Sequence, residues 1–209
     1  MCGRIAQTET PEELADLLGV SRGLEEVSHL GPSFNVPPSK ILPGLTLDLD
    51  GGAKWAAFEW GMLPSWGNFR RPVISARCET AHEKPMFRHA FRSRRCVIPV
   101  SAYYEWLTGS GGKQPYCIRP ADGSPMLLAA LYTGGQCVIL TRAARPDIAH
   151  IHDRMPVAVS RLEVWLHELK AAVAAFAEAD RMELEFFPVT RRMGNPRING
   201  PQCLDPAGG

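Results

Sequence analysis

The residues best suited to covalent chemistry stand at the start of the chain, in Met1-Cys2-Gly3-Arg4. If Met1 is removed, which a side chain as small as that of Cys2 usually permits, the chain begins with a 1,2-aminothiol. The ordinary pKa values of its amine and thiol, about 7.7–8.0 and about 8.5, leave both with a nucleophilic fraction near neutral pH. Such a group traps an aldehyde as a Schiff base and then as a thiazolidine ring. A cysteine placed there by accident is the alternative, because motifs this short often match by chance.

A second candidate is Glu105, in the aromatic segment Tyr103-Tyr104-Glu105-Trp106. Desolvation by aromatic neighbours raises the pKa of a carboxyl group toward the range useful for general acid–base catalysis. The competing interpretation has Glu105 pointing outward from a strand while the aromatic rings point inward. Both remain open from the residues alone, because perturbed carboxylates also occur in purely structural positions.

Imidazole, carboxylate and guanidinium groups gather in His150-Ile151-His152-Asp153-Arg154. Histidine changes charge near pH 7 and can shuttle protons, and a neighbouring aspartate can fix its tautomer. His150 and His152 also have the spacing of a metal-binding pair. No third ligand stands out, however, and a metal site needs three or four that converge. We therefore expect no metal and no cofactor.

Cations and aromatic residues suggest a nucleic-acid surface. Arg4, Arg77 and Arg154 each adjoin a candidate segment, and if they converge they can make bidentate phosphate contacts. Trp66 and the loop that holds Asn35 can supply a surface on which single-stranded nucleic acid stacks, with core packing as the alternative for the loop. Residues 80–95 are compatible with a helix whose outer face is basic, which is either a solvated face or a phosphate track.

Composition bounds the class of protein. A chain of 209 residues with 45% apolar residues fits a single domain, and 19 Gly and 18 Pro indicate many turns and strands. A net charge of +1 excludes a globally basic nucleic-acid coat but not a local basic stripe. Six cysteines without C-x-x-C spacing favour reduced thiols in a cytosol. The sequence has neither a signal-peptide h-region nor a long apolar run, so we expect a soluble cytoplasmic protein without a membrane partner.

The elements that must position these residues are mostly strands. A capping box at residues 10–13 predicts a helix that stops at Gly19, and a second at 160–163 predicts an alanine-rich helix to about Ala179. The proline-rich stretch 31–44 predicts an extended loop. The domain should span 1–203, with a frayed tail at 204–209. Apolar stretches at 45–49 and 54–60 are followed by strand signals at 96–106, 115–119, 126–132, 136–141 and 184–189.

Six segments occur in a telling order: Cys2-Gly3-Arg4, Phe34-Asn35-Val36-Pro37, Trp60-Gly61-Met62-Leu63-Pro64-Ser65-Trp66, Ala76-Arg77-x-Glu79-Thr80, Tyr104-Glu105-Trp106 and Ile151-His152-Asp153-Arg154-Met155-Pro156. In order and spacing, to about Gly200, they resemble the SOS response-associated peptidase family. The resemblance implies a single α+β domain in which a few helices flank a strand-dominated, barrel-like mixed sheet.

The resemblance also implies a function. Its members sense abasic sites in single-stranded DNA and crosslink to them through the N-terminal cysteine, here Cys2, as a thiazolidine. Glu105 then corresponds to the acid–base of ring opening and Schiff-base formation, and His152 to the residue that orients and protonates the sugar oxygen. Arg77 and Arg154 match arginines that hold the phosphates beside the lesion. We expect a monomer that associates with the nucleoid when DNA is damaged.

Ser75 departs from the family pattern, which has asparagine before Ala-Arg. A serine hydroxyl offers one donor and a shorter reach than an amide, so we expect slower or looser lesion recognition. Two other functions stay open beside covalent capture. One is a thiol peptidase that removes its own first residue, and the other is a non-catalytic module that binds single-stranded DNA with steep salt dependence.

Overall fold

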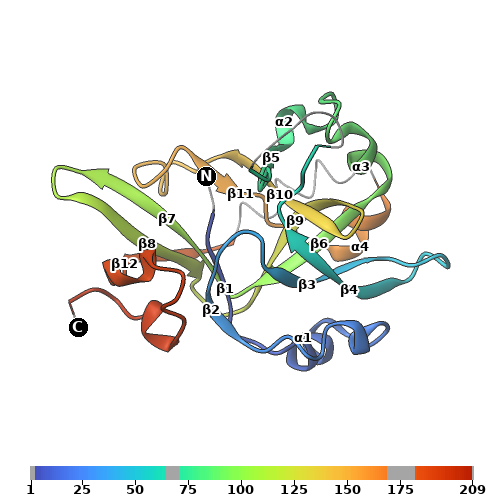
Figure 1. The fold of residues 1–209 in the computed structure, drawn as a ribbon, viewed down its shortest axis with the longest axis horizontal. Coiled ribbons are helices and arrows are strands. Elements are labelled where there is room, and N and C mark those ends of the chain that lie inside the picture. The colour runs from blue at the N-terminus through green and yellow to red at the C-terminus, as the bar shows by residue number, and fades with distance from the viewer. Residues whose placement is uncertain (1–2, 65–70, 169–181, 209) are drawn as a thin grey trace.

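The computed structural model describes residues 3–64, 71–168 and 182–208, and shows an α+β domain built on two sheets (Figure 1). The first sheet has the strand order β12-β8-β7-β1-β2. Its strands are β1 (Ile5–Gln7), β2 (Ser33–Val36), β7 (Ala102–Gly109), β8 (Gly112–Pro120) and β12 (Leu184–Pro188).

The second sheet closes on itself. Strand β10 pairs with both β4 and β9, and the pairings β4–β3, β3–β6 and β6–β9 complete a ring, while β5 and β11 join at β10. The predicted fold class, including its barrel-like character, is therefore confirmed. The strands are β3 (Ile41–Leu47), β4 (Ala53–Trp60), β5 (Ser75–Arg77), β6 (Arg95–Val100), β9 (Met126–Thr133), β10 (Gln136–Ala143) and β11 (Arg154–Pro156).

Local signals placed the first helix correctly. Helix α1 (Pro11–Leu18) begins after Thr10, whose Oγ1 accepts the Glu13 N–H at 3.2 Å, while Glu13 Oε2 accepts the Thr10 N–H at 2.8 Å. Gly19 ends the helix in the left-handed region at a φ of 67°. Both ends are set by residues inside the segment, so no distant contact overrides them.

The second predicted capping box is wrong. Helix α4 (Leu162–His167) has Arg161 as its N-cap, with an extended backbone and no side-chain cap hydrogen bond. Ser160 lies one residue too early to act as the cap. The helix ends before Glu168, which is also extended. The rest of the predicted alanine-rich helix falls in 169–181, outside the described residues.

The predicted basic helix over 80–95 is also wrong. Two short helices, α2 (Cys78–Ala81) and α3 (Arg88–Ser93), occupy this stretch. Arg95 opens strand β6 and is only 7% exposed. Its guanidinium donates to the carbonyl oxygens of Trp165 at 2.6 Å and Leu166 at 2.7 Å. These carbonyls come from α4, a partner that no pattern within 80–95 could reveal.

Two further boundaries differ from expectation. The stretch 31–44 contains β2 and the start of β3, so the predicted loop is largely sheet. The strand signal over 96–106 divides at Ser101 into β6 and β7, which belong to different sheets. Ser101 donates its N–H to Ala6 O at 2.9 Å and its hydroxyl to Glu9 at 2.6 Å, which fixes the crossing between the sheets.

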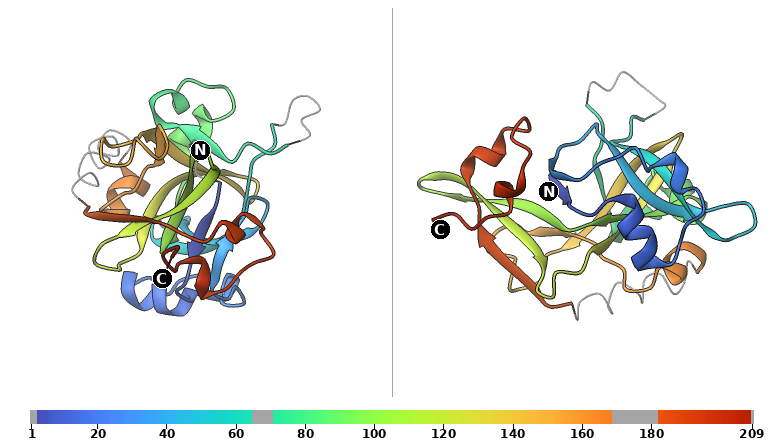
Figure 2. Two further views of the ribbon diagram at one scale, coloured as in Figure 1. Left: turned by 90° about the vertical axis from the view of Figure 1, so that its left-hand side faces the viewer. Right: turned by 90° about the horizontal axis from the view of Figure 1, so that it is seen from below.

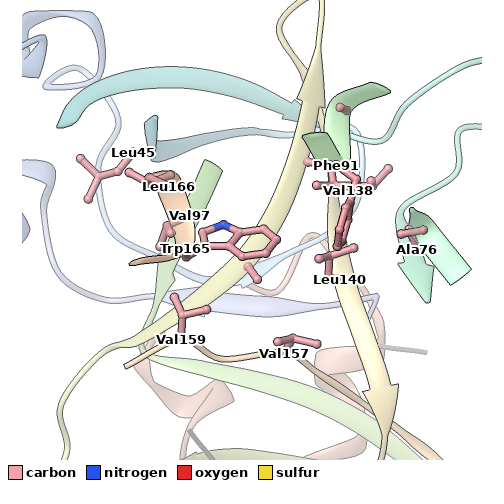
Figure 3. Close-up of a cluster of buried hydrophobic side chains, with 14 of the residues drawn as sticks. Leu45, Ala76, Phe91, Val97, Val138, Leu140, Val157, Val159, Trp165 and Leu166 are labelled. Carbon is pink, nitrogen blue, oxygen red and sulfur yellow. The ribbon is translucent and has the colours of Figure 1, made fainter. Parts of the chain in front are cut away.

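The core centres on Trp165, which is fully buried in a cluster formed by α4, the ring strands and α3 (Figure 3). Its Nε1–H donates to Cys96 O at 2.8 Å, so α4 is tied to β6 by a polar bond inside an apolar cluster. The described cysteines are free thiols. None of the described helices has the length and apolar character needed to cross a bilayer.

Candidate active site

Strand β1 brings the start of the described chain beside β7. The two strands are antiparallel, with Ile5 opposite Tyr103, and the Tyr104 N–H donates to Arg4 O at 3.0 Å. In this register the residues before Ile5 follow β7 in the direction of Glu105. Cys2 itself lies outside the described residues, as does Trp66. The roles predicted for these two residues therefore stay predictions.

Glu105 and His152 share one pocket. A cavity of about 330 Å³ is lined by Glu105, Trp106, Thr108, Lys113 and His152. The first four come from the β7–β8 hairpin, and His152 comes from the loop that leads into β11. The structure thus brings together the two acid–base candidates that the sequence separates by dozens of residues.

Glu105 is a buried carboxyl group poised between its two protonation states. Only 2% of the residue is exposed. Burial raises the pKa of its carboxyl group to about 7, because the anion loses hydration. Near neutral pH the group can therefore both donate and accept a proton, as a general acid–base residue must.

His152 is fixed in one tautomer by the backbone. Its Nδ1 accepts the Arg154 N–H at 3.0 Å, so the neutral ring carries its proton on Nε2. Burial lowers the pKa of the imidazole, which favours this neutral form. Asp153 Oδ1 also lies 3.0 Å from Nδ1, yet an Nδ1 that accepts from a backbone N–H cannot also donate to the carboxylate. Asp153 pairs with His152 only when the ring is protonated.

Arg154 is held by a carboxylate that the sequence did not single out as a site residue. Its guanidinium donates two hydrogen bonds to Glu79, at 2.7 and 2.8 Å, and a third to Thr141 O at 2.6 Å. These bonds lower the pKa of Glu79 to about 2. The phosphate contact predicted for Arg154 stays a prediction, since its guanidinium already carries a bidentate partner.

Strand β5 carries Ser75 and Arg77 and lies beside β10, near Arg154. It runs parallel to β10, with Ser75 opposite Ile139 and Arg77 opposite Thr141, the residue that also binds Arg154. Ser75 is 8% exposed, whereas Arg77 is exposed at the end of the strand. Arg77 is therefore accessible to a phosphate, whereas Ser75 is buried two residues before it.

Arg4 and Asn35 form a connected pair next to the pocket. The Arg4 guanidinium lies 5.9 Å from the centre of the Trp106 ring and donates to Asn35 Oδ1 at 2.7 Å. Asn35 is 1% exposed, and its amide donates to the carbonyl oxygens of Met193 at 2.8 Å and Ile198 at 2.7 Å. In this arrangement Asn35 positions Arg4 through its amide oxygen, and the DNA contact predicted for it stays a prediction.

Several site residues escaped sequence reasoning. Trp106 and Glu79 lie inside the segments that carry the family resemblance, so their position was a usable signal. Thr108 and Lys113 line the pocket because they face each other across the β7–β8 hairpin, a register that no local motif announces.

The two histidines of the possible metal pair are separated by their contacts. His150 packs its ring 5.6 Å from that of Phe186, while His152 lines the pocket. Among the described residues, His, Cys, Asp and Glu form no group of three that could hold a metal ion.

Comparison with known proteins places this geometry in a family. The model of the family described as SOS response associated peptidase (SRAP) matches residues 1–196. The chain belongs to that family.

Curated relatives agree with this assignment, and a solved structure shares the fold. The chain is 29% identical to the abasic site processing protein YedK of Escherichia coli, over 99% of this chain and 100% of that one. It is 25% identical to the abasic site processing protein HMCES of Xenopus tropicalis, over 98% of this chain and 78% of the relative. A crystal structure of a Bacteroides thetaiotaomicron protein has the same fold, with a TM-score of 0.81 at 22% identity over 99% of this chain and 100% of that one.

Proposed function

We propose that this protein senses abasic sites in single-stranded DNA and captures them covalently through Cys2 after Met1 is removed. The observation that carries the proposal is the pocket shared by Glu105 and His152, toward which the start of the described chain runs along β7. The names of the relatives, abasic site processing proteins, support the same substrate.

The pocket supplies what each step of capture needs. The α-amine adds to the aldehyde of the ring-opened deoxyribose to give a carbinolamine, and one water leaves to form a Schiff base. The protonated carboxyl of Glu105 donates the proton that this water requires. The Cys2 thiol then adds to the imine carbon and its proton passes to nitrogen, which closes the thiazolidine. The net reaction loses one water, and no group is oxidised or reduced.

His152 acts on the sugar. Its Nε2–H is fixed by the bond that Nδ1 receives from the backbone, so it donates to the sugar oxygen without changing tautomer. Burial lowers the pKa of this imidazole, so the neutral ring is the form that donates from Nε2 near neutral pH. Arg77, which is exposed at the end of β5, holds a phosphate next to the lesion.

The test is a crosslinking assay with single-stranded DNA that carries one abasic site. A heat-stable adduct on a denaturing gel, with an intact mass equal to protein plus DNA minus one water, is the expected result. Cys2→Ala should lose the adduct, and Cys2→Ser should keep only a reducible Schiff base. Salt-sensitive binding without any adduct in the wild type would overturn the proposal and leave a non-catalytic DNA-binding module.

A second candidate activity is removal of Met1 by the protein itself. The family description names a peptidase, and the pocket holds an acid–base pair toward which the described start of the chain runs. Intact masses of wild type and Glu105→Gln, expressed in the same host, separate self-processing from trimming by the host. Retention of Met1 in Glu105→Gln alone supports self-processing, whereas equal removal in both proteins contradicts it.

A further inference from the structure

A second cavity lies beside the turn end of the β7–β8 hairpin, where the C-terminal segment packs near Gln114. It has a volume of about 730 Å³. The segment contains the 3-10 helices η3 (Arg191–Gly194) and η4 (Pro201–Cys203), and it lies against the hairpin in both views (Figures 1 and 2). We call it the basic cavity, and the lining residues used below are Gln114, Arg191, Arg192, Arg197, Asn199 and Asp205.

The basic cavity has an excess of positive charge. Three guanidinium groups line it against the single carboxylate of Asp205. Arg192 and Arg197 are exposed, and across the described residues neither guanidinium has a hydrogen-bond or ion-pair partner. Elsewhere Arg154 is matched by a carboxylate. Unmatched arginines around one cavity are the arrangement that attracts an anion.

The walls of the basic cavity are rigidly built. Arg191 donates to Gln114 Oε1 at 3.1 Å and to Gly111 O at 2.9 Å, which anchors η3 to the hairpin. Asn199 Oδ1 accepts the backbone N–H groups of Phe34 at 2.7 Å and Asn35 at 3.1 Å. Since the oxygen is engaged by these donors, the amide nitrogen of Asn199 is left as a further donor for a ligand.

The basic cavity adjoins the candidate active site. Neighbouring residues of β8, Lys113 and Gln114, line the first pocket and the basic cavity respectively. Arg4 bridges the two: it lies over Trp106 of the first pocket and donates to Met193 O of η3 at 3.1 Å. Because successive strand residues face opposite sides of a sheet, the two cavities lie on opposite sides of the hairpin, and the connection between them runs past Arg4 to η3, which carries Arg192.

We propose that the basic cavity binds phosphodiester groups of the DNA strand that continues away from the captured lesion. The inference rests on the proposed function for the identity of the strand. Arg192 and Arg197 supply the charge, and Asn199 supplies a neutral donor. Guanidinium groups recognise phosphate through paired N–H donors, and several such contacts make affinity dependent on strand length and on salt.

The experiment measures non-covalent binding in a Cys2→Ala background, by fluorescence anisotropy with undamaged single strands of increasing length. Arg192→Ala/Arg197→Ala should weaken binding of long strands about tenfold, with a loss that grows with length. Two lost phosphate contacts should reduce the slope of log affinity against log salt by about 1.4, at about 0.7 per contact on single strands. A loss of the same size at every length would overturn the proposal.

A control of equal charge change is available at the opposite end of the molecule. Arg22 pairs with Asp48 and Asp50 at the β3–β4 turn, and Arg161 precedes α4. Figure 1 and the right-hand view of Figure 2 place these elements far from the C-terminal segment. Arg22→Ala/Arg161→Ala should leave the length dependence of binding intact. Equal losses in the two double variants would contradict a dedicated site.

Two further outcomes separate the sources of the anion and the two proposals. Titration with inorganic phosphate, monitored by NMR chemical shifts, tests whether the basic cavity binds a free anion. The strand proposal is overturned if these shifts require Arg192 and Arg197 while the double variant binds DNA with unchanged affinity. If wild type forms no adduct with abasic DNA while the length-dependent loss persists, capture fails and the basic cavity stands. If the adduct forms and the loss is absent, only the basic cavity fails.

Discussion

Two carboxyl groups near the candidate active site have pKa values that are shifted in opposite directions. Glu79 faces Arg154, which supplies two hydrogen bonds, and the pKa of Glu79 falls to about 2. Glu105 sits in the pocket wall, where burial raises its pKa to about 7. Each is a single glutamate in a short sequence motif. Only the surroundings of each residue in the fold distinguish their pKa values.

The difference separates a fixed charge from a movable proton. Glu79 is ionised at every physiological pH, so it serves as a permanent anchor for Arg154 and for the corner formed by β5, β10 and β11. Glu105 changes state close to neutral pH, so it can take part in proton transfer. A structural ion pair requires a carboxyl group with a low pKa, and acid–base chemistry beside it requires another carboxyl group with a pKa near neutral.

The largest expected effect comes from replacing Glu105, whose carboxyl group gains or loses its proton near neutral pH. Glu105→Gln should slow crosslinking by about 10²–10⁴-fold, the usual contribution of general acid–base catalysis. Because the protonated carboxyl assists the departure of water, the wild-type rate should fall as pH rises through about 7, and the variant should lack that fall. Single-turnover rates between pH 5 and 9 provide the measurement. A variant with the wild-type profile would remove Glu105 from the chemistry.

The same substitution should increase stability, with a definite sign. A carboxyl group with a folded-state pKa raised from 4.5 to about 7 destabilises the fold as pH rises through that window, because the unfolded chain ionises first. Glu105→Gln should therefore match wild type near pH 4 and exceed it at pH 8 by up to about 3 kcal/mol, at about 1.4 kcal/mol per pKa unit. Urea unfolding at both pH values measures this difference. An equal difference at both would show that burial of Glu105 is not the cause.

Glu79→Gln should produce a smaller loss that does not change between pH 5 and 9. The variant leaves Arg154 without its carboxylate partner, and we expect crosslinking to slow about tenfold through misplacement of the β11 corner. The stabilising contribution of Glu79 is present above its unfolded pKa and disappears as pH falls toward about 2, so the effect should be constant from pH 5 to 9. Arg154→Gln and the double variant complete a cycle, in which additive losses would mean that the pair does not act as a unit.

The smallest expected effect concerns Ser75. Ser75→Asn replaces the hydroxyl by an amide with a second donor, a carbonyl oxygen and a longer reach, and we expect crosslinking to accelerate a few-fold. Ser75→Ala is the matched control, because it removes the hydroxyl in the same 8% exposed position without extending the side chain. Crosslinking rates at subsaturating DNA decide the matter, and equal rates for wild type and Ser75→Asn would count against a role in recognition.

Sequence reasoning succeeded where the determining contacts lie within a segment. The Thr10–Glu13 capping box is satisfied inside four residues, and helix α1 follows it. It failed at Arg95, assigned to an exposed helix, because the carbonyl groups of Trp165 and Leu166 that bury it come from much later in the chain. It also failed at α4, whose N-cap is Arg161, with an extended backbone and no side-chain cap, in place of the expected Ser160.

Two residues of the pocket, Glu105 and His152, could be singled out from the sequence, but the electrostatics around them could not. Order and spacing pointed to Glu105 and His152, and the shared pocket brings both together. No pattern indicated that Arg154 would be paired with Glu79, or that the Asn35 amide would donate to carbonyl groups of the C-terminal segment. These depend on strand register and on chain reversal near the C-terminus, which a linear motif does not encode.

Strand β1 is an interior strand of its sheet, and this position has a consequence for the timing of folding during biosynthesis. Strand β1 lies between β2 and β7, and β7 is complete only at Gly109. A two-stranded pairing of β1 with β2 alone is marginal in water. At about 5–20 residues per second, the ribosome needs roughly 5–20 s to supply β7 after the first residues emerge. During that interval β1 has no β7 partner, so this side of β1 stays unpaired until synthesis has passed Gly109.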